Sequence, residues 1–251
     1  MVTTPVTVLM PVYNENHDNL KALIQDVLVA GYALILVDDG SDDGIQAGFP
    51  DVIILRHQVN LGQGAALETG MQYARYKGIE MLVHMDADGQ HRVDEIATLL
   101  QPILTGKADI VFGSRFLSSK SVSLIPWRRR WQLRISKYIN TFFTGVRMSD
   151  VHNGFRAMNQ KAIQQIRLKV SGRGHASEIV YQANIHKLKF CEAPVHIDYD
   201  QPNQTNPMSL GKMLSLGGSL FWARLNKYKM KIPEKVSYTR QQCLRAAGIN
   251  N

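Results

Sequence analysis

Short apolar runs alternate with segments of helical periodicity through the first half of the chain, and this alternation constrains the fold more than any other feature. The runs are rich in aliphatic and β-branched residues, which is typical of strands buried on both faces of a sheet. There are five of them: Val6–Met10, Ala33–Val37, Val52–Leu55, Glu80–Val83 and Asp109–Phe112. Because strands that alternate with helices are joined by right-handed crossovers, the pattern predicts an α/β fold with a mostly parallel central sheet flanked by helices.

The segments between the runs carry the signals of helices. In the first segment, apolar residues recur at the spacing of one helix face: Leu20, Leu23, Ile24, Val27 and Leu28. Asp18 or Asn19 is the expected N-cap, and Gly31 is the expected stop. We expect a second helix after Gly64 and a third over Val93–Leu104.

The second half of the chain is less regular. A helix that opens at Gly174 is expected to run to about His186. The other expected elements are a basic helix from about Pro126 to Thr144, a polar loop over Asp150–Arg156, a short helix over Asn159–Ile166, and a strand over Phe190–Ile197 with a break at Pro194.

Composition and charge restrict the class of protein. The 251 residues are 45% hydrophobic and carry a net charge of +8, with acidic residues in excess up to Ser119 and basic residues in excess after it. This division predicts a cation-binding side and an anion-facing side. No nucleic-acid-binding motif accompanies the basic half, so nucleic acid is not an expected partner. Cys191 and Cys243 form neither a metal-binding pair nor a redox motif, which is typical of a reducing cytoplasm.

Acidic loops follow three of the predicted strands. Glu15 follows the first, Asp38 and Asp39 close the second, and Asp86 and Asp88 follow the fourth. Carboxyl ends of parallel strands share one edge of a sheet, where ligands bind in open α/β folds. The acidic groups are therefore expected to converge on a hard cation. The alternative for Asp86 and Asp88 is an Asx-rich turn that caps the next helix.

Five motifs in order give the chain a family resemblance. They are Pro11-Val12-Tyr13-Asn14-Glu15, Val37-Asp38-Asp39-Gly40-Ser41-Asp42-Asp43-Gly44, Asn60-x-Gly62-x-Gly64-x-Ala66, Asp86-Ala87-Asp88-Gly89-Gln90-His91 and Gly113-Ser114-Arg115-Phe116. Over roughly residues 5–200 the chain resembles the family 2 glycosyltransferases of the GT-A fold, a Rossmann-like nucleotide-diphospho-sugar transferase fold, and within them the branch similar to dolichol-phosphate mannose synthases. The dinucleotide-binding Gly-x-Gly-x-x-Gly and the phosphate-binding P-loop are absent from the sequence.

The resemblance implies a nucleotide-diphosphate-sugar donor and a divalent metal, Mg²⁺ or Mn²⁺. Asp86, Asp88 and Gln90 would hold the metal. Asp39 and Glu15 would contact base and ribose, and Arg115 would approach the phosphates, where positive charge stabilises the leaving nucleoside diphosphate. The full set expected to bind the donor is Pro11, Tyr13, Glu15, Asp38, Asp39, Gly64, Asp86 and Arg115.

The resemblance also implies inversion at the anomeric carbon, and the acceptor decides whether a base is needed. For a hydroxyl acceptor, Glu178 is the expected base and Asp150 the second choice, with Asp88 also at the reaction centre. The alternative for Glu178 is a carboxylate that stabilises the start of a helix. A polyprenyl phosphate acceptor is already anionic and needs no base. The residues expected to meet the acceptor are Arg128, Arg129, Arg156 and His175.

Two departures from the family pattern bear on the acceptor. Gln63 stands where relatives often have Lys. The Arg and Gly-x-Ser-Lys pattern of synthases that use a lipid phosphate is missing from Asp198–Asn206. The sequence therefore favours a saccharide or lipid-linked saccharide hydroxyl, in cell-surface polysaccharide biosynthesis, over a polyprenyl phosphate. From other classes, a silent nucleotide-sugar-binding scaffold and a sugar-nucleotide nucleotidyltransferase fit the motifs less well.

The end of the chain predicts a second unit. Residues 1–207 form the expected GT-A catalytic domain, and residues 208–251 a basic amphipathic tail whose helix either lies on an anionic membrane surface or packs on the core. Its apolar stretch Met213–Ala223 is too short to span a bilayer. Met1–Pro5 shows no signal peptide, so the protein is expected in the cytoplasm, peripheral on the inner face of the cell membrane.

Overall fold

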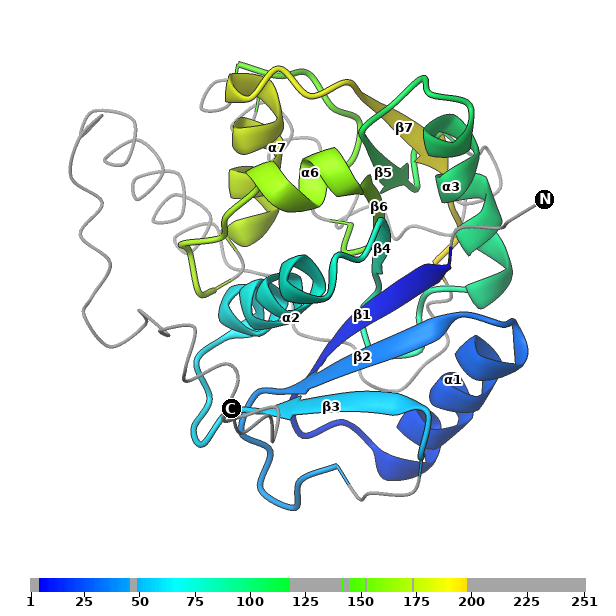
Figure 1. Ribbon diagram of the computed structural model, residues 1–251, viewed down its shortest axis with the longest axis vertical. Helices are drawn as coiled ribbons and strands as arrows, with labels where there is room; N and C mark the ends of the chain where they lie inside the picture. The colour runs from blue at the N-terminus through cyan, green and yellow to red at the C-terminus, as the bar shows by residue number, and fades with distance from the viewer. Residues whose placement is uncertain are drawn as a thin grey trace.

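The computed structural model describes residues 5–45, 49–117, 141, 145–151, 153–172 and 174–197. Its centre is a seven-stranded sheet (Figure 1). In spatial order the strands are β3 (Val52–Arg56), β2 (Ala33–Asp38), β1 (Val6–Val12), β4 (Met81–His84), β6 (Arg156–Asn159), β5 (Ile110–Ser114) and β7 (Phe190–Pro194). Every pairing is parallel except the two that β6 makes with β4 and β5. The predicted α/β fold is confirmed.

Helices cover both faces of the sheet (Figure 1). They are α1 (His17–Val29), α2 (Gln63–Lys77), α3 (Ile96–Leu104), which follows the 3₁₀ turn η1 (Val93–Glu95), α6 (Gln160–Gln165) and α7 (His175–Ile185). Since side chains of a strand alternate between faces, β1 sends Val8 and Met10 to the core under α1 and α3, and Leu9 to the core under α2, α6 and α7. Both cores are apolar, as the continuous apolar runs predict.

The start of α1 differs from the prediction, whereas its end agrees. The N-cap is Asn16, whose side-chain oxygen accepts the backbone N–H groups of Asp18 and Asn19 at 3.0 and 3.1 Å. Asp18 and Asn19 therefore lie within the first turn, where their own amides need the cap. Gly31 follows the helix with a φ of 81°, which is the left-handed conformation that favours glycine at this position.

Strand β6 was not predicted from sequence. The polar loop expected to end at Arg156 gives way there to an antiparallel strand inserted between β4 and β5. Four residues are too few to show a period, so nothing local marks the strand. In the paired register, Arg156 lies opposite His84. The following helix, α6, is capped by Asn159, whose side chain accepts the N–H of Ala162 at 3.0 Å.

The expected strand after α7 ends earlier than predicted. Strand β7 stops at Pro194, where the sequence indicated a break. Apart from Thr141, which is helical, the expected helix at 126–144 lies outside the described residues. The same holds for Arg128 and Arg129, residues 198–206 and the tail 208–251. In the part of the chain that is described, no helix has both the length and the apolar character needed to cross a membrane.

Candidate active site

Three acidic side chains converge where β1 and β4 end. The strands are parallel neighbours, and the loops beyond Val12 and His84 carry Glu15, Asp86 and Asp88. Burial raises the pKa of Glu15, and the negative charges of Asp88 and Asp86 raise it further. Burial, followed by the charge of Asp86, also raises the pKa of Asp88. The structure thus places these three carboxylates close enough to repel one another, as the sequence predicts.

A divalent cation would relieve this repulsion, and the donor set fits one. Carboxylate oxygens are the ligands that Mg²⁺ and Mn²⁺ prefer. Among the described residues, no group of three or more His, Cys, Asp or Glu side chains is arranged to hold a metal. Mg²⁺ is commonly held by one or two carboxylates and completed by phosphate oxygens of the substrate, so a pair such as Asp86 and Asp88 is sufficient.

Asp86 is the better-defined member of the pair. Its Oδ1 accepts the side-chain N–H of Gln63 at 2.8 Å, and its Oδ2 lies 3.5 Å from Nε2 of His91. Burial alone would raise the pKa of Asp86, but the hydrogen bond and charge of His91, with the charges of Arg156 and His175, lower it below its usual value. Asp86 is therefore kept ionised, as a metal ligand must be.

Asp88 lies in a tight turn without capping a helix. Its Oδ1 accepts the backbone N–H of Gln90 at 3.0 Å, which is an Asx turn. The next helical segment, η1, has Arg92 at its N-cap position and no side-chain cap. The turn expected in the alternative interpretation is therefore present, but the helix cap is not.

Asp38 and Asp39 are buried and hold neighbouring loops. Asp39 accepts from Nδ1 of His57 at 2.7 Å, and from the backbone N–H groups of Leu61 and Gly62 at 2.9 and 2.7 Å. Asp38 accepts the backbone N–H of Ser41 at 2.8 Å. In this arrangement both carboxylates shape the loops beside the site. A direct contact of Asp39 with a nucleotide base would require these hydrogen bonds to be shared.

Arg115 and Asp150 form a buried pair instead of two separate site groups. Nε and Nη2 of Arg115 donate to the Asp150 carboxylate at 2.6 and 2.8 Å. Glu192 on β7 accepts the backbone N–H of Asp150 at 3.1 Å and so helps to hold the pair. A carboxylate in a bidentate buried ion pair accepts a proton only if the pair is broken. This pairing weighs against Asp150 as a base, and Arg115 faces Asp150 rather than an open phosphate site.

Arg156 and His84 were not recognised from sequence as neighbours of Asp86. Arg156 is 1% exposed, so it lies beneath the site and is not a surface contact for an acceptor. Burial lowers its pKa to about 10 despite the charges of Asp86 and Asp150. Its Nε and Nη1, and both ring nitrogens of His84, lack hydrogen-bond partners. The pairing of the unpredicted strand β6 with β4 is what brings them together.

The remaining predicted residues lie around this centre in different ways. Pro11 is buried in β1, whereas Tyr13 is 46% exposed. Gly64 is in the first turn of α2, and its N–H donates to Ser171 O at 2.7 Å. His175 begins α7 with its Nδ1 2.9 Å from Gly172 O. Glu178 is buried, and its carboxylate is bound to the backbone N–H groups of Lys169 and Val170.

The buried His84 predicts a specific dependence of stability on pH. Burial, and then the charge of Arg156, lowers the pKa of His84 from 6.5 to about 3. The unfolded chain binds a proton as the pH falls through 6.5, whereas the folded chain stays neutral, so stability decreases toward acid. Because of His84, the free energy of unfolding should decrease by about 2 kcal/mol between pH 7 and pH 5.

Urea unfolding at both pH values would measure the loss. In a His84→Leu variant, which has no titratable group at this position, the unfolding free energy should fall by about 2 kcal/mol less over the same interval. Equal losses in the two proteins would show that His84 is protonated or solvated in the folded state.

Known proteins resemble this chain in sequence and in fold. Residues 7–167 match the family model described as glycosyl transferase family 2. A polyprenol monophosphomannose synthase of Mycolicibacterium smegmatis is 35% identical over 209 residues, 77% of each chain. A UDP-N-acetylglucosamine–dolichyl-phosphate N-acetylglucosaminyltransferase of Methanococcus voltae is 27% identical over 247 residues, 90% of this chain and 96% of the relative.

The fold has a solved counterpart as well. The glucosyl-3-phosphoglycerate synthase of Mycobacterium tuberculosis, in a complex with Mn²⁺, uridine diphosphate and glucosyl-3-phosphoglycerate, superposes with a TM-score of 0.59. The match covers 99% of this chain and 81% of that one, at 15% identity. At this identity the likeness shows a shared fold.

Proposed function

Because the chain belongs to glycosyl transferase family 2 and is a glycosyltransferase that uses a nucleotide sugar, we propose that it transfers this sugar to a polyprenyl phosphate. The transfer would proceed with inversion at the anomeric carbon, with a divalent metal at Asp86 and Asp88. The observation that carries the metal site is the convergence of Glu15, Asp86 and Asp88 at the end of β1 and β4. When bound, Mg²⁺ or Mn²⁺ would neutralise charge on the departing nucleoside diphosphate.

The residues of the chain have separate parts in this mechanism. Asp86 and Asp88 would hold the ion next to the donor diphosphate, and Gln63 orients the Asp86 carboxylate. Gln63 is also the first residue of α2, so the positive end of that helix lies beside Asp86, where it favours an anion. His91 and Arg156 lower the pKa of Asp86 and so keep its carboxylate ionised.

Two observations favour a polyprenyl phosphate over a saccharide hydroxyl. Both relatives are named for polyprenol or dolichyl phosphate products or substrates. In addition, the two carboxylates expected to act as base are occupied, Asp150 by Arg115 and Glu178 by backbone N–H groups. A phosphate acceptor needs no base. The hydroxyl acceptor stays the second candidate because residues 198–206 lack the Arg and Gly-x-Ser-Lys pattern.

The acceptor implies a membrane surface. A polyprenyl phosphate is anchored in a bilayer, and the excess of basic residues after Ser119 would draw the protein to its anionic face. We propose a peripheral position on the inner face of the cell membrane, with the tail 208–251 as part of the contact. Nucleic acid is not among the proposed partners.

Calorimetry with UDP-sugars and GDP-sugars, with and without Mn²⁺, tests the donor and the metal together. We expect one nucleotide class to bind in the low micromolar to millimolar range, and the affinity to fall at least about tenfold when Mn²⁺ is withheld. Equal binding with and without metal would overturn the metal assignment.

Transfer assays would then separate the two acceptors. Vesicles that contain anionic lipid and undecaprenyl phosphate are expected to yield a labelled lipid product, whereas vesicles with the same lipids and undecaprenol are not. Transfer to undecaprenol, or to a soluble oligosaccharide alone, would favour the hydroxyl acceptor.

A further inference from the structure

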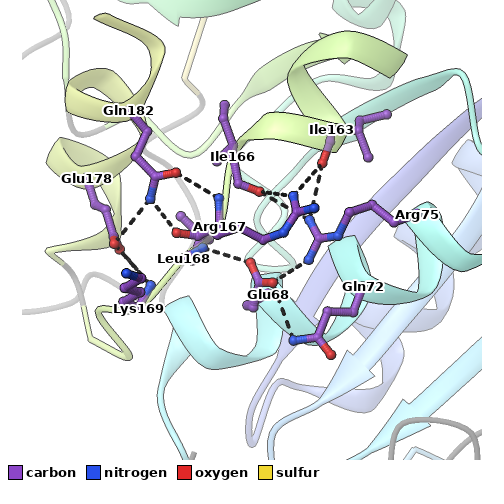
Figure 2. A network of polar contacts seen from close by, with 10 residues as sticks. All are labelled: Glu68, Gln72, Arg75, Ile163, Ile166, Arg167, Leu168, Lys169, Glu178 and Gln182. Carbon is purple, nitrogen blue, oxygen red and sulfur yellow. Dashed lines mark hydrogen bonds and ion pairs between the residues drawn. The ribbon is translucent and has the colours of Figure 1, made fainter. Parts of the chain in front are cut away.

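Two carboxylates, Glu178, which is buried, and Glu68, which is largely buried, hold the segment between α6 and α7. We call Arg167–Gly172 the linking segment. Glu68 on α2 accepts the backbone N–H of Leu168 at 2.8 Å, and Glu178 on α7 accepts that of Lys169 at 3.0 Å (Figure 2). Glu178 also accepts the backbone N–H of Val170 at 3.0 Å. Glu178 is 4% exposed. Side chains of two helices therefore supply the hydrogen-bond acceptors that the carbonyl groups of a neighbouring strand would supply in a sheet.

Further polar contacts keep both carboxylates in place (Figure 2). Glu68 is paired with Arg75, which also donates to Ile163 O and Ile166 O at 3.2 Å. Oε1 of Gln182 accepts the N–H of Arg167 at 2.8 Å, and its Nε2 donates to Glu178 at 3.3 Å. As a result, four consecutive backbone N–H groups, from Arg167 to Val170, are each bound by a side chain of α2 or α7.

The far end of the linking segment lies against the turn that begins α2. Ser171 O accepts the N–H of Gly64 at 2.7 Å. A Cβ on Gly64 would be 2.0 Å from Val170 O, and one on Gly62 would be 2.5 Å from Ser171 O. Only glycine allows the two backbones to approach this closely. Between these glycines lies Gln63, whose Nε2 donates to Oδ1 of Asp86 at 2.8 Å.

We propose that Glu68 and Glu178 are positioning residues for the metal–diphosphate site. Their carboxylates fix the linking segment, the segment fixes the Gly62–Gly64 turn, and the turn aims Gln63 at Asp86. The inference rests on the proposed function, because it assigns the two residues to the same site. It also gives Glu178 a role that needs no proton transfer to the acceptor.

The chemistry of these contacts requires carboxylates. A carboxylate offers acceptor oxygens only, and the groups that face these two are N–H donors on both oxygens. They are Leu168 N, Gln72 and Arg75 at Glu68, and Lys169 N, Val170 N and Gln182 at Glu178. A glutamine would turn an NH₂ group toward one of the same donors. Burial raises the pKa of Glu68 and of Glu178, so the fold keeps both acids where they are costly to ionise. Such a cost is expected where a polar arrangement serves a site.

Mn²⁺-dependent binding of UDP or GDP, whichever the wild type binds more tightly, tests the proposal by calorimetry. We expect Glu178→Gln and Glu68→Gln each to weaken this binding about tenfold and to raise the donor KM more than they lower kcat. In a Gln63→Ala background the same substitutions should change the affinity less than about twofold, since the path to Asp86 is already broken.

Asp109→Asn is the matched control. Asp109 is a buried carboxylate that also accepts a backbone N–H, from Lys189 at 2.8 Å, but it lies directly before β5. Its replacement should lower the melting temperature and leave nucleotide affinity unchanged. If Glu178→Gln does not fold, Glu68→Gln carries the test alone. Affinities equal to wild type, or equal effects with and without Gln63, would overturn the inference. Absence of Mn²⁺-dependent binding in the wild type would instead overturn the proposed function, and the inference with it.

Discussion

Replacing Asp86 by Asn is expected to lower the rate of sugar transfer about a thousandfold and to abolish Mn²⁺-dependent nucleotide binding. Asparagine keeps the shape of the side chain and an acceptor oxygen for Gln63, but it removes the charge that holds the ion. Asp88→Asn should behave in the same way, because Asp88 is the second carboxylate of the pair. Transfer from the preferred nucleotide sugar and calorimetry with Mn²⁺ measure the two effects.

Asp94→Asn provides the control for these substitutions. Asp94 is exposed a few residues further along the chain, where it pairs with Arg92 at 2.8 Å. Its replacement should leave transfer and binding within about twofold of wild type, since exposed ion pairs contribute little. Thermal unfolding should show that all three variants fold. An Asp86→Asn enzyme that retained metal-dependent binding would exclude Asp86 as a ligand.

Replacing Gly154 by Ala is the second change with a large expected effect. A Cβ at Gly154 would be 2.1 Å from Oδ2 of Asp86 and 2.4 Å from its Cγ, so the carboxylate must move. We expect a loss of about a hundredfold in kcat/KM, because a displacement of about 1 Å at a reaction centre has this effect. The overpacked site should also cost about 1–3 kcal/mol of stability.

Gly172→Ala separates displacement of Asp86 from a general effect of added bulk. A Cβ at Gly172 meets nothing within 4 Å, so this variant should keep wild-type stability and transfer. Steady-state kinetics and urea unfolding of both variants measure the difference. Wild-type kinetics in Gly154→Ala would mean that the Asp86 carboxylate does not need the position that it has in the structure.

From sequence alone, the α/β fold, the five leading strands and the position of Asp86 and Asp88 at a strand end could be predicted. These features follow from local patterns, because apolar runs, helix periods and turn residues depend on neighbours along the chain. The ordered motifs also identified the family. Glu15 could be placed beside the aspartates for the same reason, since parallel strands end at one edge.

The pairing of polar side chains with one another could be seen only in the folded chain. Arg115 and Asp150 are 35 residues apart, and Leu168 is 100 residues from the carboxylate of Glu68 that binds it. Such pairings depend on the order of the strands in the sheet. This order includes β6 between β4 and β5, and β6 is too short to show a periodic pattern in the sequence. The sequence therefore predicted which acids line the site. Burial in the folded chain determines that Asp150 binds Arg115 and that Glu178 binds backbone N–H groups, because a buried carboxylate must have its hydrogen bonds satisfied.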